Sequence, residues 1–365
     1  MSNFEHTIAL LDSFLEAGVP GYDFELRRHG EVLLRRYAGF SNREKKIPMN
    51  GRERYYIYSC SKPITCAAAL QLWERGLFRL EDELCEYMPE FAEMKVRTPD
   101  GGTVPARKRI TIFNLFTMTA GFNYNLNNPA ILRCWDATHG AVPTRECIRF
   151  LAEEPLDFEP GADWRYSLCH DVLAAFVEVV SGMPFNDYVT QHIFKPLGMK
   201  DSTYLLPAAE MPGLAEQYRC WAPGVIMPIG MRNVYRLGTD YASGGAGCVS
   251  TMEDYSRFVD AIRAGERVLS RETIRMMASP QLTPELRERY MAVNDTRYTY
   301  GLGIRSPFVE GSSCSDVGWG GAAGAYLAID LKNDLSIVYL QHVLNTPNGT
   351  TRRTLPDVVR QDLGL

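Results

Sequence analysis

The sequence has no long uncharged apolar run, although 45% of its 365 residues are hydrophobic. A helix that crosses a bilayer needs about 20 consecutive, mostly apolar residues, so no membrane partner is expected. Residues 1–18 also lack the basic start, continuous apolar stretch and small-residue cleavage site of a secretion signal. They are expected to form an amphipathic helix that ends near Gly18.

Histidine is scarce, and cysteine shows no paired spacing. The six histidines form no H-x-x-H or H-E-x-x-H motif, and the nine cysteines form no C-x-x-C motif. These absences argue against a bound metal, and the absence of a glycine-rich nucleotide loop argues against a nucleotide cofactor, so no cofactor is expected. An odd number of scattered cysteines without an export signal is typical of reduced thiols, which predicts a cytoplasmic protein.

No block of one charge sign stands out. The net charge is −5, and the longest basic cluster, residues 43–46, is interrupted by Glu44. A nucleic-acid partner is therefore not expected. The G-x-S-x-G elbow of α/β-hydrolases is also missing. The oligomeric state leaves no signal in the sequence.

Alternating apolar and polar residues occur near both chain ends. Residues 22–40 alternate around a turn at 28–30, and residues 316–331 and 335–344 flank a second turn. The middle of the chain has helical apolar spacing. We therefore expect an α+β fold, an α/β sandwich with an antiparallel sheet flanked by helices. Its sheet domain would comprise residues 1–80 and 235–365, with a mainly helical lobe over 81–234.

The stretch Tyr55–Gly76, YYIYSCSKPITCAAALQLWERG, holds the first chemical candidates. Pro63 fits only the first turn of a helix, so the helix should begin close to Ser59. Lys62, three residues on, then shares a helical face with the Ser59 hydroxyl. A serine nucleophile needs a partner for its proton, and a desolvated lysine can serve. The alternative is a capping serine beside a solvent-exposed lysine.

Several segments resemble, in order, the serine β-lactamase and penicillin-recognising superfamily. The resemblance is greatest to its class C-like branch and to the family VIII carboxylesterases. YSCSKPITCAAALQLWERGLFRLEDEL is similar to the S-x-x-K helix and following turn of that family, and ITIFNLFTMTAGF to its I-T-I-x-x-L-L-T-H-T-S-G-L. WRYSLCHD, YASGGAGCVSTMEDYSRF and GWGGAAGAYLAID occupy the places of its later motifs.

This resemblance implies specific roles. Ser59 would be the acylated nucleophile, with Lys62 and Tyr166 as its coupled proton-transfer partners. The backbone N–H groups of Ser59 and Ala322 would form the oxyanion hole. Without the motif context, Tyr166 would be read as a core aromatic residue.

The sequence departs from the family at two motifs that bind substrate. Leu168 replaces the asparagine of Y-x-N, and Trp319-Gly320-Gly321 replaces the third motif with its cationic residue. Tryptophan offers one N–H donor and no charge, and W-G-G resembles the family VIII esterases. Both changes point away from a specialised β-lactamase.

Other residues in the loops and after the second motif are weaker candidates. Tyr124, Trp135 and Trp221 lie in long loops and are candidate walls of an acyl pocket, although surface or packing roles explain them nearly as well. Asp171 is a candidate N-cap of the helix after Tyr166.

We therefore expect a serine carboxylesterase that cleaves small esters through a Ser59 acyl-enzyme, with weak or no β-lactamase activity. An amidase, a D-amino-acid peptidase, an acyltransferase or a β-lactamase on the same nucleophile is the alternative. A non-catalytic binding protein would not need Ser59, Lys62 and Tyr166 together.

Overall fold

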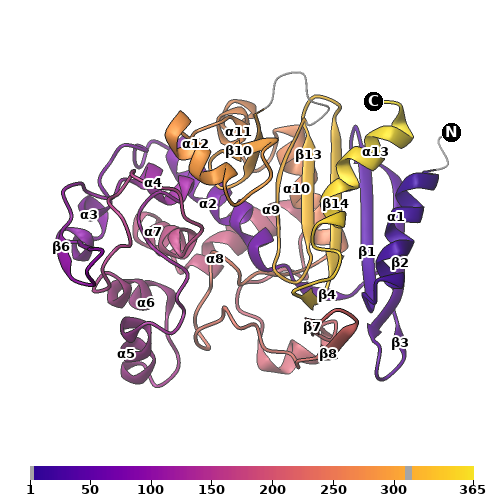
Figure 1. Cartoon of the computed structure of the whole chain (residues 1–365), viewed down its shortest axis with the longest axis horizontal. Helices are drawn as coiled ribbons and strands as arrows, with labels where there is room; N and C mark the ends of the chain where they lie inside the picture. Colours follow the sequence, from indigo (N-terminus) through magenta and orange to yellow (C-terminus); the bar gives the residue numbers. More distant parts are fainter. Residues whose placement is uncertain (1–3, 309–314) are drawn as a thin grey trace.

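One sheet built from both ends of the chain organises the molecule (Figure 1). The computed structural model describes residues 4–308 and 315–365. In order across the sheet, its strands are β10 (Tyr298–Tyr300), β11 (Arg305–Pro307), β12 (Asp316–Gly320), β13 (Tyr326–Asp330), β14 (Leu335–Gln341), β1 (Gly21–Arg28), β2 (Glu31–Asn42) and β3 (Ile47–Pro48). The strand pairs are antiparallel.

The two predicted hairpins are neighbours in this sheet. β1 pairs with β14, with Leu26 opposite Ile337, so the first and last hairpins join the chain ends as expected. His29 and Gly30 form the two-residue loop between β1 and β2, and both have positive φ angles, 52° and 83°. Such loops match the right-handed twist of the strands that they connect.

Helices cover both faces of the sheet. α1 (Glu5–Glu16) and α13 (Leu355–Leu363) lie against one face, and α10 (Met252–Ala264) lies against the other (Figure 1). Successive side chains of β14 point to opposite faces of the sheet. Tyr339 packs in the core under α1 and α13, whereas Leu340 belongs to the larger core around α10. The N-cap of α10 is Thr251, whose side chain accepts the Asp254 N–H.

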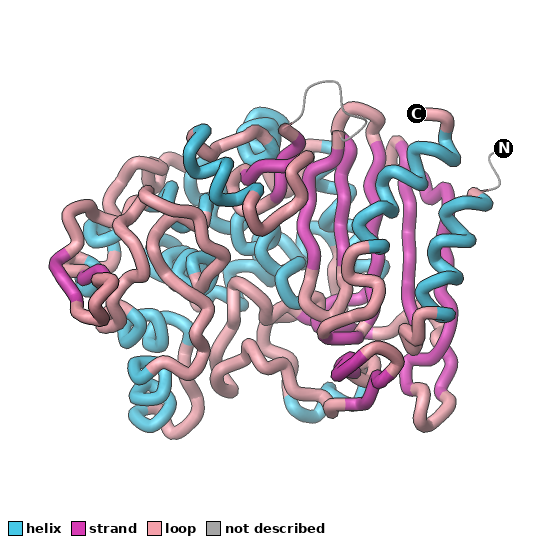
Figure 2. The backbone as a smooth tube through the Cα atoms, viewed as in Figure 1, coloured by secondary structure: helices cyan, strands magenta, loops and turns pink. Residues whose placement is uncertain are grey.

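Helices and loops form the rest of the molecule, to the left in Figure 2. The helices are α2 (Lys62–Glu74), α3 (Leu84–Tyr87), α4 (Ile112–Thr117), α5 (Pro129–Ala137), α6 (Thr144–Leu151), α7 (Cys169–Ser181), α8 (Phe185–Val189), α9 (Lys195–Leu197), α11 (Arg271–Ala278) and α12 (Pro284–Met291). Short 3₁₀ or π segments are η1 (Tyr58–Ser61), η2 (Pro89–Phe91), η3 (Thr190–Phe194), η4 (Ala208–Gly213) and η5 (Thr351–Thr354). α2 is buried along most of its length and packs on α7. The antiparallel sheet with its flanking helices confirms the expected α+β fold.

Three small sheets in the described part of the chain accompany the large one. β4 (Arg54–Tyr56) pairs with β9 (Val249–Thr251), and β5 (Lys95–Arg97) pairs with β6 (Thr103–Pro105). β7 (Tyr218–Ala222) and β8 (Val225–Pro228) form a hairpin whose β7 runs parallel to β15 (Val343–Leu344). This hairpin lies within the range predicted as a helical lobe, yet it pairs with the C-terminal part. The division at residues 80 and 235 stays a prediction.

Candidate active site

Ser59 stands in the tight turn that starts the central helix. It belongs to η1, and α2 follows at once with Pro63 in its first turn, where proline loses no helical hydrogen bond. Tyr58, directly before it, has a φ of 49°. A left-handed non-glycine residue costs about 1–3 kcal/mol and persists where its surroundings enforce it. Here the buried Tyr58 hydroxyl bonds the Gln217 side chain.

The Lys62 amine is aimed at the Ser59 hydroxyl. Its Nζ atom lies 3.3 Å from Ser59 Oγ, 3.3 Å from the Tyr124 hydroxyl and 2.7 Å from the Gly245 carbonyl oxygen. The side chain is fully buried. Nζ also lies 4.4 Å from the centre of the Tyr166 ring, a cation–π distance. The predicted helical offset therefore brings the amine to the Ser59 hydroxyl.

Burial lowers the pKa of Lys62 to about 8, against a smaller opposing effect of the Asp171 charge. Asp171 is itself buried, which raises its pKa, and it accepts hydrogen bonds from Tyr241 and Ser243. Gly245 separates the two groups: a Cβ there would lie 2.5 Å from Asp171 Oδ2 and 3.3 Å from Lys62 Nζ. The amine is thus held close to the titration range of neutral pH.

The expected N-cap role of Asp171 is wrong. Leu168 is the N-cap of α7, without a side-chain hydrogen bond, and Asp171 lies inside the first turn of that helix.

Tyr166 completes a compact group around the Ser59 hydroxyl. Its hydroxyl hydrogen-bonds the Ser59 side chain and accepts the Trp319 Nε1–H over 3.2 Å. The ring stacks between Tyr124 and Trp319, with centroid distances of 5.5 and 5.6 Å. Burial raises the pKa of Tyr166 well above its ordinary value, and the bonds from Ser59 and Trp319 oppose that rise. At neutral pH the phenol is therefore protonated.

Gly321 lets the end of β12 approach the segment just before Ser59. A Cβ at Gly321 would lie 2.4 Å from the Ile57 carbonyl oxygen, two residues before Ser59. Without a side chain there, Ala322 and Ser59 line the same cavity. Their backbone N–H groups are the pair predicted for the oxyanion hole.

Two cavities meet at Ser59 and Tyr166. The larger, about 500 Å³, continues along Trp319, Gly320, Gly321 and Ala322. Its remaining wall is aromatic and basic, with Trp164, Tyr235, Tyr290, Tyr298, Tyr326, Arg297, Arg305, Arg352 and Arg353 among its residues. The smaller, about 430 Å³, lies along Tyr124 and the three residues after it. Tyr124 thus lines a cavity at Ser59 and in addition contacts Lys62. Its role as a wall of an acyl pocket stays a prediction.

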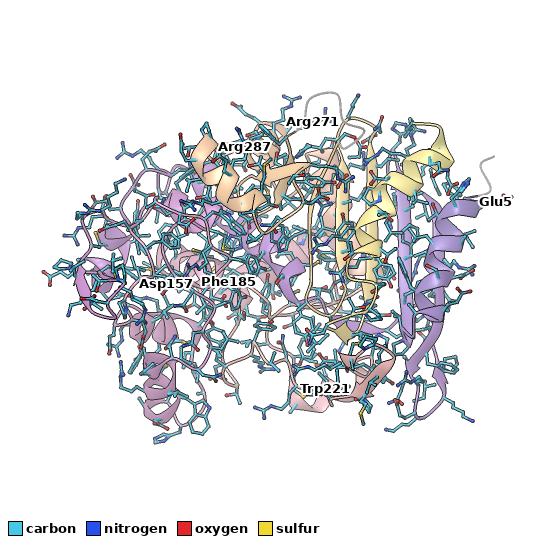
Figure 3. The ribbon with its side chains drawn as sticks, viewed as in Figure 1. Glu5, Asp157, Phe185, Trp221, Arg271 and Arg287 are labelled. Atoms are coloured by element: carbon cyan, nitrogen blue, oxygen red, sulfur yellow. The ribbon has the colours of Figure 1, made fainter. Side chains whose placement is uncertain are left out.

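Three candidates for substrate contact lie elsewhere. Trp135 on α5 is 51% exposed, and Trp221 on β7 is 61% exposed; neither lines the cavities at Ser59. Figure 3 shows Trp221 at the lower edge of the molecule, in the β7–β8 hairpin. Leu168 is 2% exposed and packs in the core. The interpretation of these two tryptophans as pocket walls is therefore wrong, because their segments face outward, and Leu168 offers no surface to a substrate.

The β-lactamase sequence profile matches residues 7–360. The chain belongs to the β-lactamase family. It is 30% identical to Esterase EstB of Burkholderia gladioli over 351 residues, which cover 86% of this chain and 83% of the relative. Lovastatin esterase of Penicillium rubens is 28% identical over 348 residues, 87% of each protein.

The architecture agrees with this membership. The structure of EstCE1, a hydrolase with promiscuous acyltransferase activity, superposes with a TM-score of 0.79 at 24% identity and covers 97% of both chains. The fold is thus of the β-lactamase and transpeptidase type. Within residues 4–308 and 315–365, no helix has the length and apolar character of a membrane span, and no three His, Cys, Asp or Glu residues gather as metal ligands.

Proposed function

We propose that the protein is a serine carboxylesterase that acts through an acyl-enzyme on Ser59. The observation that carries the proposal is the shared contact at one oxygen: both the Lys62 amine and the Tyr166 hydroxyl hydrogen-bond Ser59 Oγ. A hydroxyl held by a lysine of lowered pKa and by a second proton carrier has the arrangement of an activated nucleophile.

The reaction follows from this geometry. Ser59 Oγ bonds to the ester carbonyl carbon while its proton passes to the Lys62–Tyr166 pair. The carbonyl oxygen becomes an oxyanion that the N–H groups of Ser59 and Ala322 stabilise. Collapse breaks the bond to the alcohol, which takes the proton from the pair. Water then attacks the acyl-enzyme by the same route and releases the acid and Ser59.

We propose small esters with aryl or short acyl groups as substrates, because part of the cavity wall is aromatic. Trp164, Tyr235 and Tyr290 give its walls apolar ring faces. The residue at the place of the cation in the third motif is Trp319, which is uncharged and engaged with Tyr166. We therefore propose weak or no hydrolysis of β-lactams, since the family cation that meets their carboxylate is replaced.

The test compares a panel of p-nitrophenyl esters, D-amino-acid amides and nitrocefin on the purified protein, with fluorophosphonate labelling of Ser59. Ester turnover above that of the other substrates, with the label on the Ser59 peptide, is expected. Nitrocefin hydrolysis faster than any ester, or a label on Cys60 or Ser61, would overturn the proposal.

Acyl transfer is a second candidate, supported by the two cavities that meet at Ser59. One can hold the acyl group while an alcohol enters the other and replaces water at the acyl-enzyme. Product analysis with added benzyl alcohol tests this: benzyl ester formed in proportion to the alcohol supports transfer, and free acid alone contradicts it.

For the cellular location, we propose a reducing compartment such as the cytoplasm. The eight described cysteines, all but Cys314, are free, and six of them are buried. Cys314 lies outside the described residues.

A further inference from the structure

A buried arginine contacts the peptide group that is proposed to provide the second oxyanion donor. Arg352 is in η5, before α13, and is 7% exposed. Its Nη2 donates a hydrogen bond to the Gly321 carbonyl oxygen at 3.4 Å. That carbonyl and the Ala322 N–H belong to the same peptide group.

The charge on Arg352 has no counter-ion among the described residues. The Nε of Arg352 has no hydrogen-bond partner in residues 4–308 and 315–365. Burial and the neighbouring Arg353 lower the pKa of Arg352. A buried, unpaired cation is costly to stability, so its packing alone does not account for this residue.

The peptide group transmits the charge to the N–H. In a trans peptide the C=O and N–H point in opposite directions and share one conjugated system. A guanidinium at the oxygen draws electron density from the nitrogen and makes the N–H a stronger donor, as hydrogen bonds polarise one another in series. The Gly321 carbonyl also accepts a hydrogen bond from the Gly324 N–H at 3.0 Å. This second bond should hold the orientation of the Gly321–Ala322 peptide group when Arg352 is replaced.

We propose that Arg352 is a positioning residue that strengthens the Ala322 N–H as an oxyanion donor by bonding to the Gly321 carbonyl. The inference rests on the proposed function, because it assumes that Ala322 stabilises the oxyanion of the Ser59 reaction. It predicts a loss in stabilisation of the tetrahedral intermediate, with little change in binding of the uncharged ester.

The test uses Arg352→Met, which removes the charge, and Arg352→Gln, which keeps a donor without the charge. An aryl trifluoromethyl ketone is the probe, since Ser59 adds to its carbonyl and places an oxyanion in the hole. We expect kcat/KM for a p-nitrophenyl ester and affinity for the ketone to fall together, by about ten- to fiftyfold. That is less than the loss caused by removing a whole donor. Affinity for the corresponding methyl ketone, as an unreacted competitor, should stay within about threefold, and so should KM.

Arg353→Met is the matched control. Arg353 lines the same cavity but makes no contact with the Gly321 carbonyl, so this variant measures the long-range effect of one cavity charge. We expect the fold-loss in affinity for the trifluoromethyl ketone to be less than a third as large in Arg353→Met as in Arg352→Met. The infrared stretching frequency of the acyl-enzyme carbonyl should rise in Arg352→Met only.

The outcomes separate the two proposals. Wild-type ketone affinity in both folded Arg352 variants, or an equal loss in Arg353→Met, overturns the role of Arg352 and leaves the esterase intact. If Arg352→Met does not fold, Arg352→Gln decides by the same two readouts. A wild-type protein whose Ser59 reacts with neither ester nor fluorophosphonate overturns the proposed function and this inference with it.

Discussion

Trp319 donates its Nε1–H to the hydroxyl of Tyr166 over 3.2 Å. The residue that replaces the cation of the third motif is therefore bonded to the group proposed for proton transfer. The two rings also stack, at an interplanar angle of 25°. This contact connects the departure at Trp319 to the chemistry at Ser59, and it can be removed without disturbing the stack.

Trp319→Phe should keep the stacking and lose the hydrogen bond. Because that bond lowers the pKa of Tyr166, the variant should raise this pKa further and make loss of the phenol proton harder. We expect kcat for a p-nitrophenyl ester to fall about tenfold, as for one lost hydrogen bond. Trp135→Phe, the same change at an exposed site on α5, is the control. Equal kcat values in the two variants would contradict the role of the indole.

Ser59→Ala removes the proposed nucleophile. Esterase activity should fall by about four or more orders of magnitude while the thermal unfolding midpoint stays near that of the wild type. Mass spectrometry with a slow ester should find the acyl group on the Ser59 peptide of the wild type and none on the variant. Persistent turnover in a purified variant would place the nucleophile elsewhere.

The pH dependence tests Lys62. Its amine accepts a proton only when neutral, and its pKa is lowered to about 8. The neutral fraction therefore grows as pH rises through 8, and kcat/KM should increase up to about a hundredfold from pH 6 to pH 9 before it levels off. Lys62→Met should have a low kcat/KM at every pH and should not show this rise between pH 6 and pH 9. A flat wild-type profile would show that Lys62 does not titrate in the reaction.

The sequence predicted the parts of the site that local geometry determines. Ser59 and Lys62 are three residues apart at a helix start, and Pro63 marks that start, so their contact follows from helix periodicity. Tyr166 and Trp319 lie far from Ser59 in the chain, and only the motif resemblance indicated them.

The remaining site residues carry no local signal. Tyr124 contacts Lys62, and Arg352 contacts Gly321, through packing between segments distant in sequence. The expectation for Asp171 failed because the N-cap is the residue just before the first helical residue. The helix α7 begins at Cys169, so its N-cap is Leu168 and Asp171 lies in its first turn. β15 has two residues, too few for any periodic pattern, so its pairing with β7 could not be foreseen.

The thiols should be free. The eight described cysteines form no disulfide, and we expect all nine in the sequence to react with a thiol reagent after denaturation without reductant. The buried thiols should not react with the reagent in the native protein, since access and thiolate formation control reactivity. Seven or fewer reactive thiols in a freshly purified, denatured sample would contradict the proposed reducing compartment.

The adjacent glycines of the third motif should respond differently to alanine. At Gly321 a Cβ would lie 2.4 Å from the Ile57 carbonyl oxygen, whereas at Gly320 the nearest atoms are 3.6 Å away. Gly321→Ala must therefore push the end of β12 from the segment before Ser59, at a cost of about 1–3 kcal/mol of stability.

The same displacement separates the N–H groups of Ala322 and Ser59, so Gly321→Ala should lose about a hundredfold or more in kcat. Gly320→Ala, which meets only ordinary contacts, should unfold within about 0.5 kcal/mol of the wild type. Thermal unfolding and ester kinetics on both variants check this. A Gly321→Ala protein with wild-type stability and turnover would mean that close approach of β12 to Ile57 is not needed for the oxyanion hole.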